Sequence, residues 1–311
     1  MNIIETESLS RRYGHTEAVR DLALSVPEGS IFAFVGPNGA GKTTTIKTAM
    51  NILEPSSGRA TVLGVDSRRL GPAQFRQIGY VSENQELPGW MTIRELLDYC
   101  APFYPTWDAK FAEDLRRRLD LPLNRKVKAF SRGMRMKAAL LSSLAYRLKL
   151  LVLDEPFAGL DALVRDEFIQ GILELAEQSQ WSVFISSHDI DEVERLADWI
   201  GVINEGRLYL AEPVVDLVAR FRRIEAAFEE PDAAIRLAES LSHGDEWMAV
   251  EASGHTLRAI AARGGEPGGE DRIREVLRGA ARVEVSPMPL KAIFMALART
   301  FRSASRAEDG Q

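Results

Sequence analysis

The sequence predicts an α/β fold built on a mostly parallel sheet, followed by a smaller α+β domain. Two observations predict it. Through the first two-thirds of the chain, short apolar runs alternate with amphipathic stretches, which is the pattern of buried strands connected by helices. After Pro213 the runs become shorter and follow a different order. The 311 residues, 45% of them hydrophobic, are enough to form two separate cores.

Buried strands are predicted where apolar residues, many of them β-branched or aromatic, form short unbroken runs. These runs are Ile31–Val35, Leu150–Leu153 and Val183–Ile185. A stretch with helical periodicity follows each run, and these stretches begin at Thr43, span Ala162–Gln178 and span Ile190–Ala197. Ligands of parallel sheets bind beyond the carboxyl ends of the strands. The polar motifs at those ends are therefore the candidates for function.

A helical subdomain inserted into this core is predicted from about Glu86 to Ala145. The segment has no strand-like runs, and Pro102, Pro105 and Pro122 divide it into pieces. Its aromatic and apolar residues suggest either internal packing or a groove for a short partner helix. Those residues are Trp90, Met91, Phe103, Tyr104 and Trp107.

The carboxyl-terminal part, residues 214–311, is predicted to form a separate domain. Short strands and helices follow one another in the order β-α-β-β-α-β, which suggests a ferredoxin-like fold. An amphipathic helix is expected over Leu290–Phe301, with the segment Ser303–Gln311 frayed. Its apolar stripe must be buried against this domain or against a second copy of the chain. We expect a domain that stabilises or regulates a dimer.

Charge and cysteine content exclude several classes of protein. The net charge is −6, so no nucleic-acid partner is expected. The single cysteine, Cys100, cannot form an internal disulfide and fits a reducing compartment. The sequence has no secretory signal and no run of about 18 apolar residues. Any membrane role is therefore expected to depend on a partner, with the chain on the cytoplasmic side.

The strongest motif is a phosphate-binding loop. Residues 36–44 read GPNGAGKTT, which matches G-x-x-x-x-G-K-[ST] between a predicted strand and a predicted helix. The glycines allow backbone N–H groups to converge on phosphate oxygens, and the helix N-terminus adds partial positive charge. Lys42 is expected to reach the β- and γ-phosphates, and the Thr43 hydroxyl to hold Mg²⁺.

Two carboxylates follow the second predicted strand. Asp154 and Glu155 come directly after Leu150–Leu153. One carboxylate can complete the Mg²⁺ shell while its neighbour orients and polarises the attacking water. Alone, the pair could be a solvated loop, but the phosphate loop already requires an acidic Mg²⁺ ligand. The sequence therefore predicts a nucleotide-hydrolysing site.

Three shorter motifs indicate which kind of nucleotide hydrolase this is. FSRGM begins at Phe130, AGLD ends at Asp161, and SSH ends at His188. In this order around the two stronger motifs, over about residues 1–213, they resemble the signature, D-loop and switch histidine of the ABC ATPase family. The resemblance implies a P-loop ABC ATPase core with the inserted helical subdomain at about residues 86–145. It also implies ATP and Mg²⁺ as ligands.

The resemblance implies a role for each matching residue. Glu155 would be the general base, with Lys42 and His188 contacting the γ-phosphate. Mg²⁺ would be held by Thr43, Asp154 and Glu83. The remaining nucleotide contacts would come from the phosphate loop, an aromatic ring on adenine, and the signature and D-loop of a second ATP-binding subunit. These residues are Gly36, Asn38, Gly39, Ala40, Gly41, Thr44, Tyr13, Ser131, Gly133 and Asp161.

The sequence also departs from the family pattern. Arg132 and Met134 stand in the signature where glycine and glutamine are commonest, and Glu83 stands where the Q-loop glutamine is expected. Either Glu83 or Gln85 could serve as the Q-loop residue. With the segment FYPTWD and the carboxyl-terminal extension, these features resemble ATP-binding subunits of bacterial ABC-2-type transporters. That resemblance implies a transmembrane permease partner, export, and a peripheral position on the inner face of the cell membrane.

Three alternatives share parts of this pattern. A DNA-repair or chromosome-structuring ATPase would have a long heptad coiled coil or zinc-binding cysteines, and a translation-factor ATPase would have two phosphate loops. The sequence shows neither feature. A regulatory ABC ATPase that moves no cargo remains open, because only a membrane partner would distinguish it. Homodimer and heterodimer also remain open.

Overall fold

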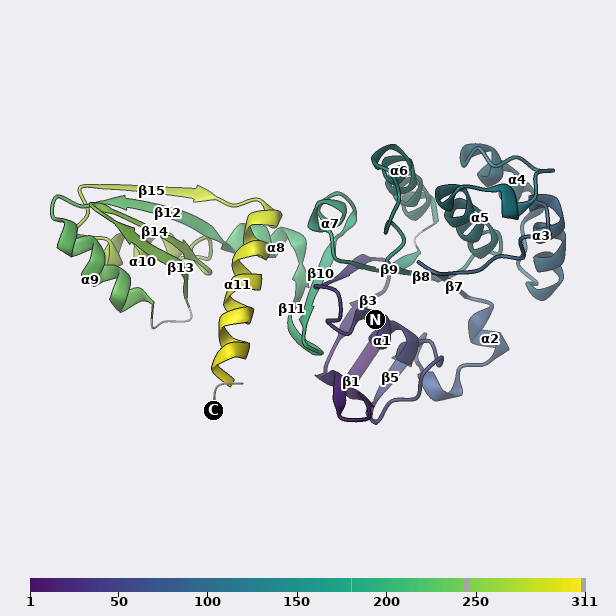
Figure 1. The fold of residues 1–311 in the computed structure, drawn as a ribbon, viewed down its shortest axis with the longest axis horizontal. Helices are drawn as coiled ribbons and strands as arrows, with labels where there is room; N and C mark the ends of the chain where they lie inside the picture. The colour runs from purple at the N-terminus through teal and green to yellow at the C-terminus, as the bar shows by residue number, and fades with distance from the viewer. Residues whose placement is uncertain (180, 243–245, 309–311) are drawn as a thin grey trace. The chain divides into compact units, whose positions relative to one another are not determined.

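The computed structural model describes residues 1–179, 181–242 and 246–308. It forms two compact units, Met1–Ala211 and Glu212–Gln311 (Figure 1). The sequence predicts the division after Pro213, and the structure divides between Ala211 and Glu212.

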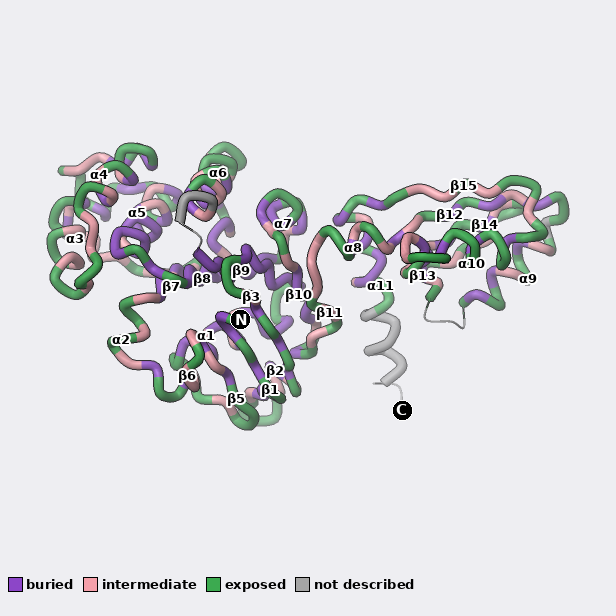
Figure 2. The backbone as a smooth tube through the Cα atoms, turned by 180° about the vertical axis from the view of Figure 1, so that it is seen from behind, coloured by how far each residue is buried: buried purple, intermediate pink, exposed green. Residues whose placement is uncertain are grey.

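A six-stranded sheet forms the centre of the first unit. Its order is β11 (Arg207–Pro213), β10 (Trp199–Asn204), β4 (Ile31–Val35), β9 (Ser182–Ser187), β8 (Leu150–Asp154) and β7 (Ile78–Ser82). The pairs from β10 to β7 are parallel. The three predicted strands are confirmed as the adjacent strands β4, β9 and β8, and every residue in them is buried. Figure 2 shows buried backbone gathered in this part of the unit.

Helices cover both faces of this sheet, as predicted. Figure 1 shows α6 and α7 on one side of the strands and α1 on the other. Their bounds are Lys42–Ala49 for α1, Ala162–Ser179 for α6 and Ile190–Leu196 for α7. Because α1 begins immediately after the phosphate loop, its N-terminus points back to the carboxyl end of β4.

A second, antiparallel sheet lies beyond α1 and was not predicted. It contains β1 (Asn2–Tyr13), β2 (Thr16–Leu22), β3 (Ser25–Pro27), β5 (Ser57–Val62) and β6 (Val65–Asp66). The apolar side chains of β1 and β2 join Phe32 and Phe34 of β4 and Ile46 of α1 in one core. The side chain of Ile46 is therefore enclosed between the two sheets.

The inserted segment is helical, as predicted, with α3 (Ile93–Cys100), α4 (Ala109–Arg118) and α5 (Arg132–Leu144) joined by connections that each contain a 3-10 helix. A capping box formed by Thr92 and Glu95 starts α3. The Asp108 carboxylate accepts a hydrogen bond from the Phe111 N–H and so starts α4.

The aromatic residues of this subdomain do not form one surface. The Trp90 side chain is 66% exposed and Phe103 is 55% exposed. Met91 is 6% exposed, because it lies just before the buried start of α3, so internal packing is the alternative that holds for it. Tyr104 stacks on Tyr146 with ring centroids 3.7 Å apart, so it packs inside the subdomain.

The second unit contains the predicted β-α-β-β-α-β order. Its strands pair antiparallel in the order β13 (Trp247–Ser253), β14 (Thr256–Ala261), β12 (Arg222–Ala227) and β15 (Arg282–Pro287). The other elements are α8 (Val214–Arg220), α9 (Pro231–Leu241), α10 (Gly269–Val276) and α11 (Leu290–Glu308). Ile224 and Leu257 of the sheet pack with Ala234 of α9 and Ile273 of α10 in a core separate from that of the first unit.

The last helix packs within its own unit. Leu290, Ile293 and Leu297 are buried, and α11 contacts α8 and β13. The expectation that Ser303–Gln311 is frayed is wrong for residues 303–308, which continue the helix, and its last three residues lie outside the described part of the chain. No proline or glycine interrupts this part of the chain before Gly310, and alanine and arginine favour helix.

Candidate active site

The phosphate loop connects the buried strand β4 to α1 in close contact with two other strands. Gly39 and Gly41 have positive φ values of 83° and 107°, which favour glycine. A Cβ atom on Gly36 would lie 2.1 Å from the Ile203 carbonyl oxygen, and one on Gly41 would lie 2.4 Å from the Ala18 carbonyl oxygen. Glycine is therefore required at both positions by the surrounding backbone.

The Lys42 ammonium group is buried under its own loop. Its Nζ donates to the Gly36 carbonyl at 2.6 Å and to the Pro37 carbonyl at 3.1 Å. It also lies 3.0 Å from Glu155 Oε1. The Lys42–Glu155 contact is an ion pair but not a hydrogen bond. Glu155 Oε1 is buried and has no hydrogen-bond partner. One buried carboxylate oxygen thus remains able to accept a proton or a water hydrogen bond.

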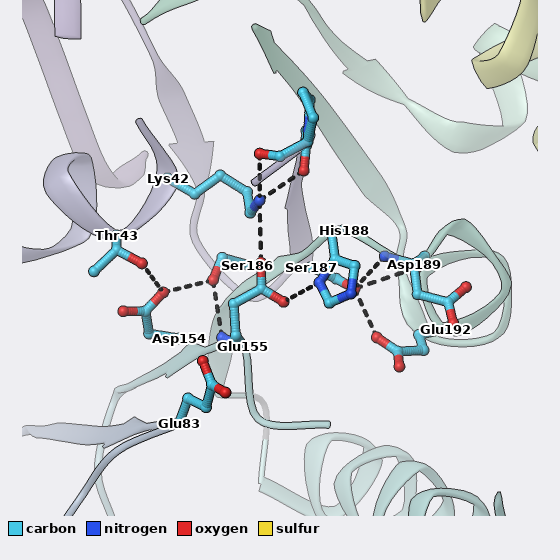
Figure 3. Close-up of polar contacts among 12 residues, drawn as sticks. Lys42, Thr43, Glu83, Asp154, Glu155, Ser186, Ser187, His188, Asp189 and Glu192 are labelled. Carbon is cyan, nitrogen blue, oxygen red and sulfur yellow. Dashed lines mark hydrogen bonds and ion pairs between the residues drawn. The ribbon is translucent and has the colours of Figure 1, made fainter. Parts of the chain in front are cut away.

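A serine connects the two acidic residues at the carboxyl edge of the sheet (Figure 3). Thr43 Oγ1 donates to Asp154 Oδ1 at 2.9 Å, and Ser186 Oγ donates to the same oxygen at 2.8 Å. The Glu155 N–H in turn donates to Ser186 Oγ at 3.0 Å. Burial raises the pKa of Asp154, and the two hydroxyl hydrogen bonds oppose that rise.

Thr43 and Asp154 fit a magnesium site. Mg²⁺ in nucleotide enzymes binds one or two protein oxygens and completes its shell with phosphates and water. Within the described ranges, no group of three or more His, Cys, Asp or Glu side chains comes together as a metal cage. A threonine hydroxyl beside a single carboxylate is the donor set expected when the substrate supplies the remaining ligands.

The second acidic residue is held by a histidine. His188 Nδ1 lies 2.7 Å from Glu155 Oε2, and because a carboxylate oxygen accepts, the Nδ1–H donates. Glu155 also has a positive φ of 51°, an uncommon conformation for this residue type and one that is typical of functional sites. Figure 3 shows Lys42 and His188 reaching Glu155 from two sides. The arrangement fixes the carboxylate, with Oε1 beside the Lys42 ammonium but accepting no hydrogen bond.

A small hollow lies beside these groups. Its lining comes from α1, the end of β7 and the end of β8, and consists of Thr43, Lys47, Ser82, Glu83, Asn84, Asp154 and Glu155. The structure therefore brings four of the predicted residues together from three distant parts of the sequence. Such a hollow can hold a phosphate group and its metal at a helix N-terminus.

Comparison with known proteins decides the family. A sequence profile described as ABC transporter matches residues 19–158. The bacitracin transport ATP-binding protein BcrA of Bacillus licheniformis is 33% identical over 243 residues, which cover 76% of this chain and 78% of BcrA. The chain belongs to the ABC transporter family. It is an ATP-binding subunit, and the resemblance found in its motifs is confirmed.

Solved structures of ABC subunits share the α/β fold. One described as the ATP-binding subunit of an ABC transporter has a TM-score of 0.63 and 27% identity, and the match covers 69% of this chain and 91% of that one. A dimeric bacterial ABC transporter cassette, MJ0796, has a TM-score of 0.62 at 20% identity, with 68% and 98% covered. The predicted fold class is thereby confirmed.

The predicted contacts from the signature, the D-loop and the adenine-stacking ring are among those that do not line the hollow of Thr43 and Asp154. Ser131 is exposed and caps α5, because its hydroxyl accepts from the Met134 N–H at 3.2 Å. Gly133 is buried, and a Cβ there would lie 2.7 Å from Val164. The Asp161 carboxylate accepts from the Val164 N–H at 3.0 Å. Tyr13 is exposed, with the Arg11 guanidinium 4.9 Å from its ring centroid.

The two Q-loop candidates of this ABC subunit differ in position. Glu83 lines the hollow, and its N–H donates to the Asp154 carbonyl at 2.9 Å. Its carboxylate accepts from Arg132 Nη2 at 2.9 Å. The Gln85 side chain instead accepts from the Ser82 N–H at 3.3 Å. Glu83 is therefore the better placed of the two to reach a bound metal.

Sequence reasoning assigned no role to Ser186 or Lys47. Ser186 touches both acidic residues, and its register explains why: Asp154 pairs with Ser186 in the parallel ladder of β8 and β9. Aligning the carboxyl ends of the two predicted strands would have brought the first serine of SSH beside the first carboxylate. Lys47 lies one turn beyond Thr43 on α1 and lines the hollow.

Proposed function

We propose that this ABC subunit hydrolyses ATP in a Mg²⁺-dependent reaction and so powers export through a separately encoded membrane subunit. The observation that supports the reaction is the pairing of Glu155 with Lys42 and His188 beside the phosphate loop. Family membership supports ATP as the nucleotide. BcrA is named for bacitracin transport. By analogy, we propose that the cargo is a small peptide or a lipid-like molecule and that it leaves the cell.

In the proposed reaction the chain's own groups bind, orient and accept a proton. The loop N–H groups and the α1 N-terminus bind the β- and γ-phosphates, and Lys42 exchanges its two loop carbonyls for phosphate oxygens. Thr43 and Asp154 hold Mg²⁺, which when bound neutralises charge on the phosphate oxygens. Glu155 accepts the proton of the attacking water at Oε1. The His188 hydrogen bond keeps the Glu155 carboxylate pointing at that water.

A second ATP-binding subunit completes each site in this proposal. Ser131 and Gly133 lie at the N-terminus of α5, outside the hollow of their own chain. A helix N-terminus with an exposed hydroxyl suits a phosphate held by another subunit. The dimeric cassette MJ0796 supports such an arrangement as a precedent for the fold.

The membrane partner would bind the helical subdomain. In the described part of the chain, no helix combines the length and apolarity needed to cross a bilayer. We therefore propose a peripheral position on the inner, cytoplasmic face of the cell membrane, through a permease subunit. The exposed aromatic side chains of Trp90 and Phe103 are the best placed for a partner helix, because exposed aromatics supply large contact area.

Trp90→Ala is expected to reduce copurification of the chain with its permease while leaving basal ATP hydrolysis within about twofold of wild type, as a surface substitution should. Ile52→Ala is the control, because Ile52 is 53% exposed but lies outside the helical subdomain. Quantified pull-down of a tagged permease provides the measurement. Equal recovery with Trp90→Ala and Ile52→Ala would place the docking site elsewhere, and loss of both recovery and hydrolysis would indicate a folding defect.

The second unit, we propose, stabilises or regulates the dimer. The clustered site residues Lys42, Thr43, Asp154, Glu155 and His188 all precede Pro213. A chain that ends at Pro213 is therefore expected to bind ATP normally and to dimerise more weakly. Sedimentation with and without Mg·ATP measures this. A folded, truncated chain that fails to bind ATP would show that the second unit contributes to the site.

A further inference from the structure

Two departures from the ABC pattern are paired with each other. Glu83, which follows β7, stands where the family pattern has a neutral glutamine, and Arg132 stands where the signature most often has glycine. The two positions are 49 residues apart in sequence, and Arg132 Nη2 donates to Glu83 Oε1 at 2.9 Å. Each departure alone would add a charge without this partner. Together they form an ion pair that joins the residue after β7 to the signature.

The Arg132 guanidinium touches a third segment. A Cβ atom on Gly159 would lie 2.5 Å from Arg132 Nη1, and Gly159 has a positive φ of 69°. The guanidinium therefore lies against the backbone of the AGLD segment. Arg132, a residue of the signature, thus contacts both the residue that follows β7 and the D-loop.

Glu83 stands between two hollows. The first contains Thr43, Asp154 and Glu155, and the second contains Arg132 and other residues of α5. Both hollows share Ser82, Glu83 and Asn84. The Glu83 backbone is fixed by its bond to the Asp154 carbonyl. Figure 3 shows its side chain next to Asp154 and Glu155 without a dashed line to either.

We propose that Glu83 and Arg132 form an exchangeable latch, in which Arg132 keeps the Glu83 carboxylate from the metal position until nucleotide and Mg²⁺ bind. This rests on the proposed function. Arg132 is a positioning residue here, because it acts on the metal site through Glu83. When Glu83 turns to the metal, the guanidinium is released beside Ser131.

The charges favour an exchange in this direction. The Arg132 and Glu83 side chains are 47% and 38% exposed, and an ion pair this exposed contributes little to stability. A divalent cation in the less exposed hollow attracts a carboxylate more strongly than a solvated guanidinium does.

The test is the Mg²⁺ concentration needed for half-maximal binding of the β,γ-imido analogue of ATP to the full-length chain. Arg132→Ala is expected to lower it by about two- to fivefold, the range allowed by an exposed ion pair. Glu83→Gln is expected to raise this Mg²⁺ concentration by about tenfold, which is the usual effect of removing a side chain that supports a metal site. In the Glu83→Gln background, Arg132→Ala should have no further effect. Arg132→Lys, which keeps the charge, should lie between wild type and Arg132→Ala.

Arg135→Ala is the matched control. Arg135 lies on the same helix and lines the same hollow, but its Nε donates to the Phe130 carbonyl at 3.2 Å. An unchanged Mg²⁺ requirement in Arg132→Ala would overturn the latch. So would an Arg132→Ala shift in the Mg²⁺ requirement that is equally large in the wild-type and the Glu83→Gln backgrounds. If the wild-type chain binds no analogue at all, the proposed function fails and the latch fails with it. If binding is normal and the Mg²⁺ dependence is the same across the series, only the latch is wrong.

Discussion

Glu155→Gln is expected to lower ATP turnover by about 10²- to 10⁴-fold, the usual contribution of a general base. Nucleotide binding should persist, because the phosphate loop, Lys42 and the Thr43–Asp154 pair are unchanged. The amide keeps the size of the side chain and can still accept the hydrogen bond from His188. It cannot accept a proton from water at neutral pH. The loss is therefore expected in the chemical step.

The control for this substitution is Glu167→Gln. Glu167 lies on α6, where it pairs with Lys137 at 2.6 Å and is half exposed. The change is chemically the same and lies outside the hollow. Its turnover should stay within about twofold of wild type, since exposed ion pairs contribute little. Equilibrium binding of ATP by both variants separates a binding defect from a chemical one.

Ser131→Asp in the Glu155→Gln background is expected to abolish ATP-dependent dimerisation. In the proposed dimer, Ser131 faces the γ-phosphate of the ATP that the second subunit holds. A negative charge about 4 Å from that phosphate costs about 4 kcal/mol at an effective dielectric constant of about 20, which is about a thousandfold in affinity. Sedimentation velocity with saturating Mg·ATP measures the change.

Ser131→Asn is the matched control for the charge. Asparagine and aspartate have nearly the same shape and both cap helices as well as serine does, so α5 should start normally in each variant. The asparagine variant should still dimerise with ATP, more weakly than the parent if the hydroxyl contacts phosphate. Equal dimerisation by the two variants would remove Ser131 from the interface.

The central sheet and the phosphate loop could be predicted because their signals are local. Strands β4 and β8 are apolar runs buried throughout, and the loop has a fixed spacing of glycines and lysine. The antiparallel sheet was missed because β1 alternates imperfectly, with register shifts against each of its partners. Its buried residues Ile4 and Leu9 are interspersed with Thr, Glu and Ser, so no single periodicity marks the strand.

The contacts between distant segments could not be predicted for a different reason. The Glu83–Arg132 pair lies on a partly exposed surface, where charged residues carry no periodic signal. The sequence showed both residues as departures but not that they meet. Met91 directly follows the exposed Trp90 in sequence, yet the start of α3 buries it. Short-range patterns indicate elements, whereas these contacts depend on how the elements pack.

Phosphate release at saturating ATP, by the wild-type chain and by Glu155→Gln, tests the central claim most directly. We expect release by the wild-type chain to require Mg²⁺, to stop when EDTA removes the metal, and to fall by at least about 10²-fold in Glu155→Gln. Release by Glu155→Gln within about twofold of wild type, or wild-type release that continues in EDTA, would contradict the assignment of Glu155 as the base of a magnesium-dependent ATPase.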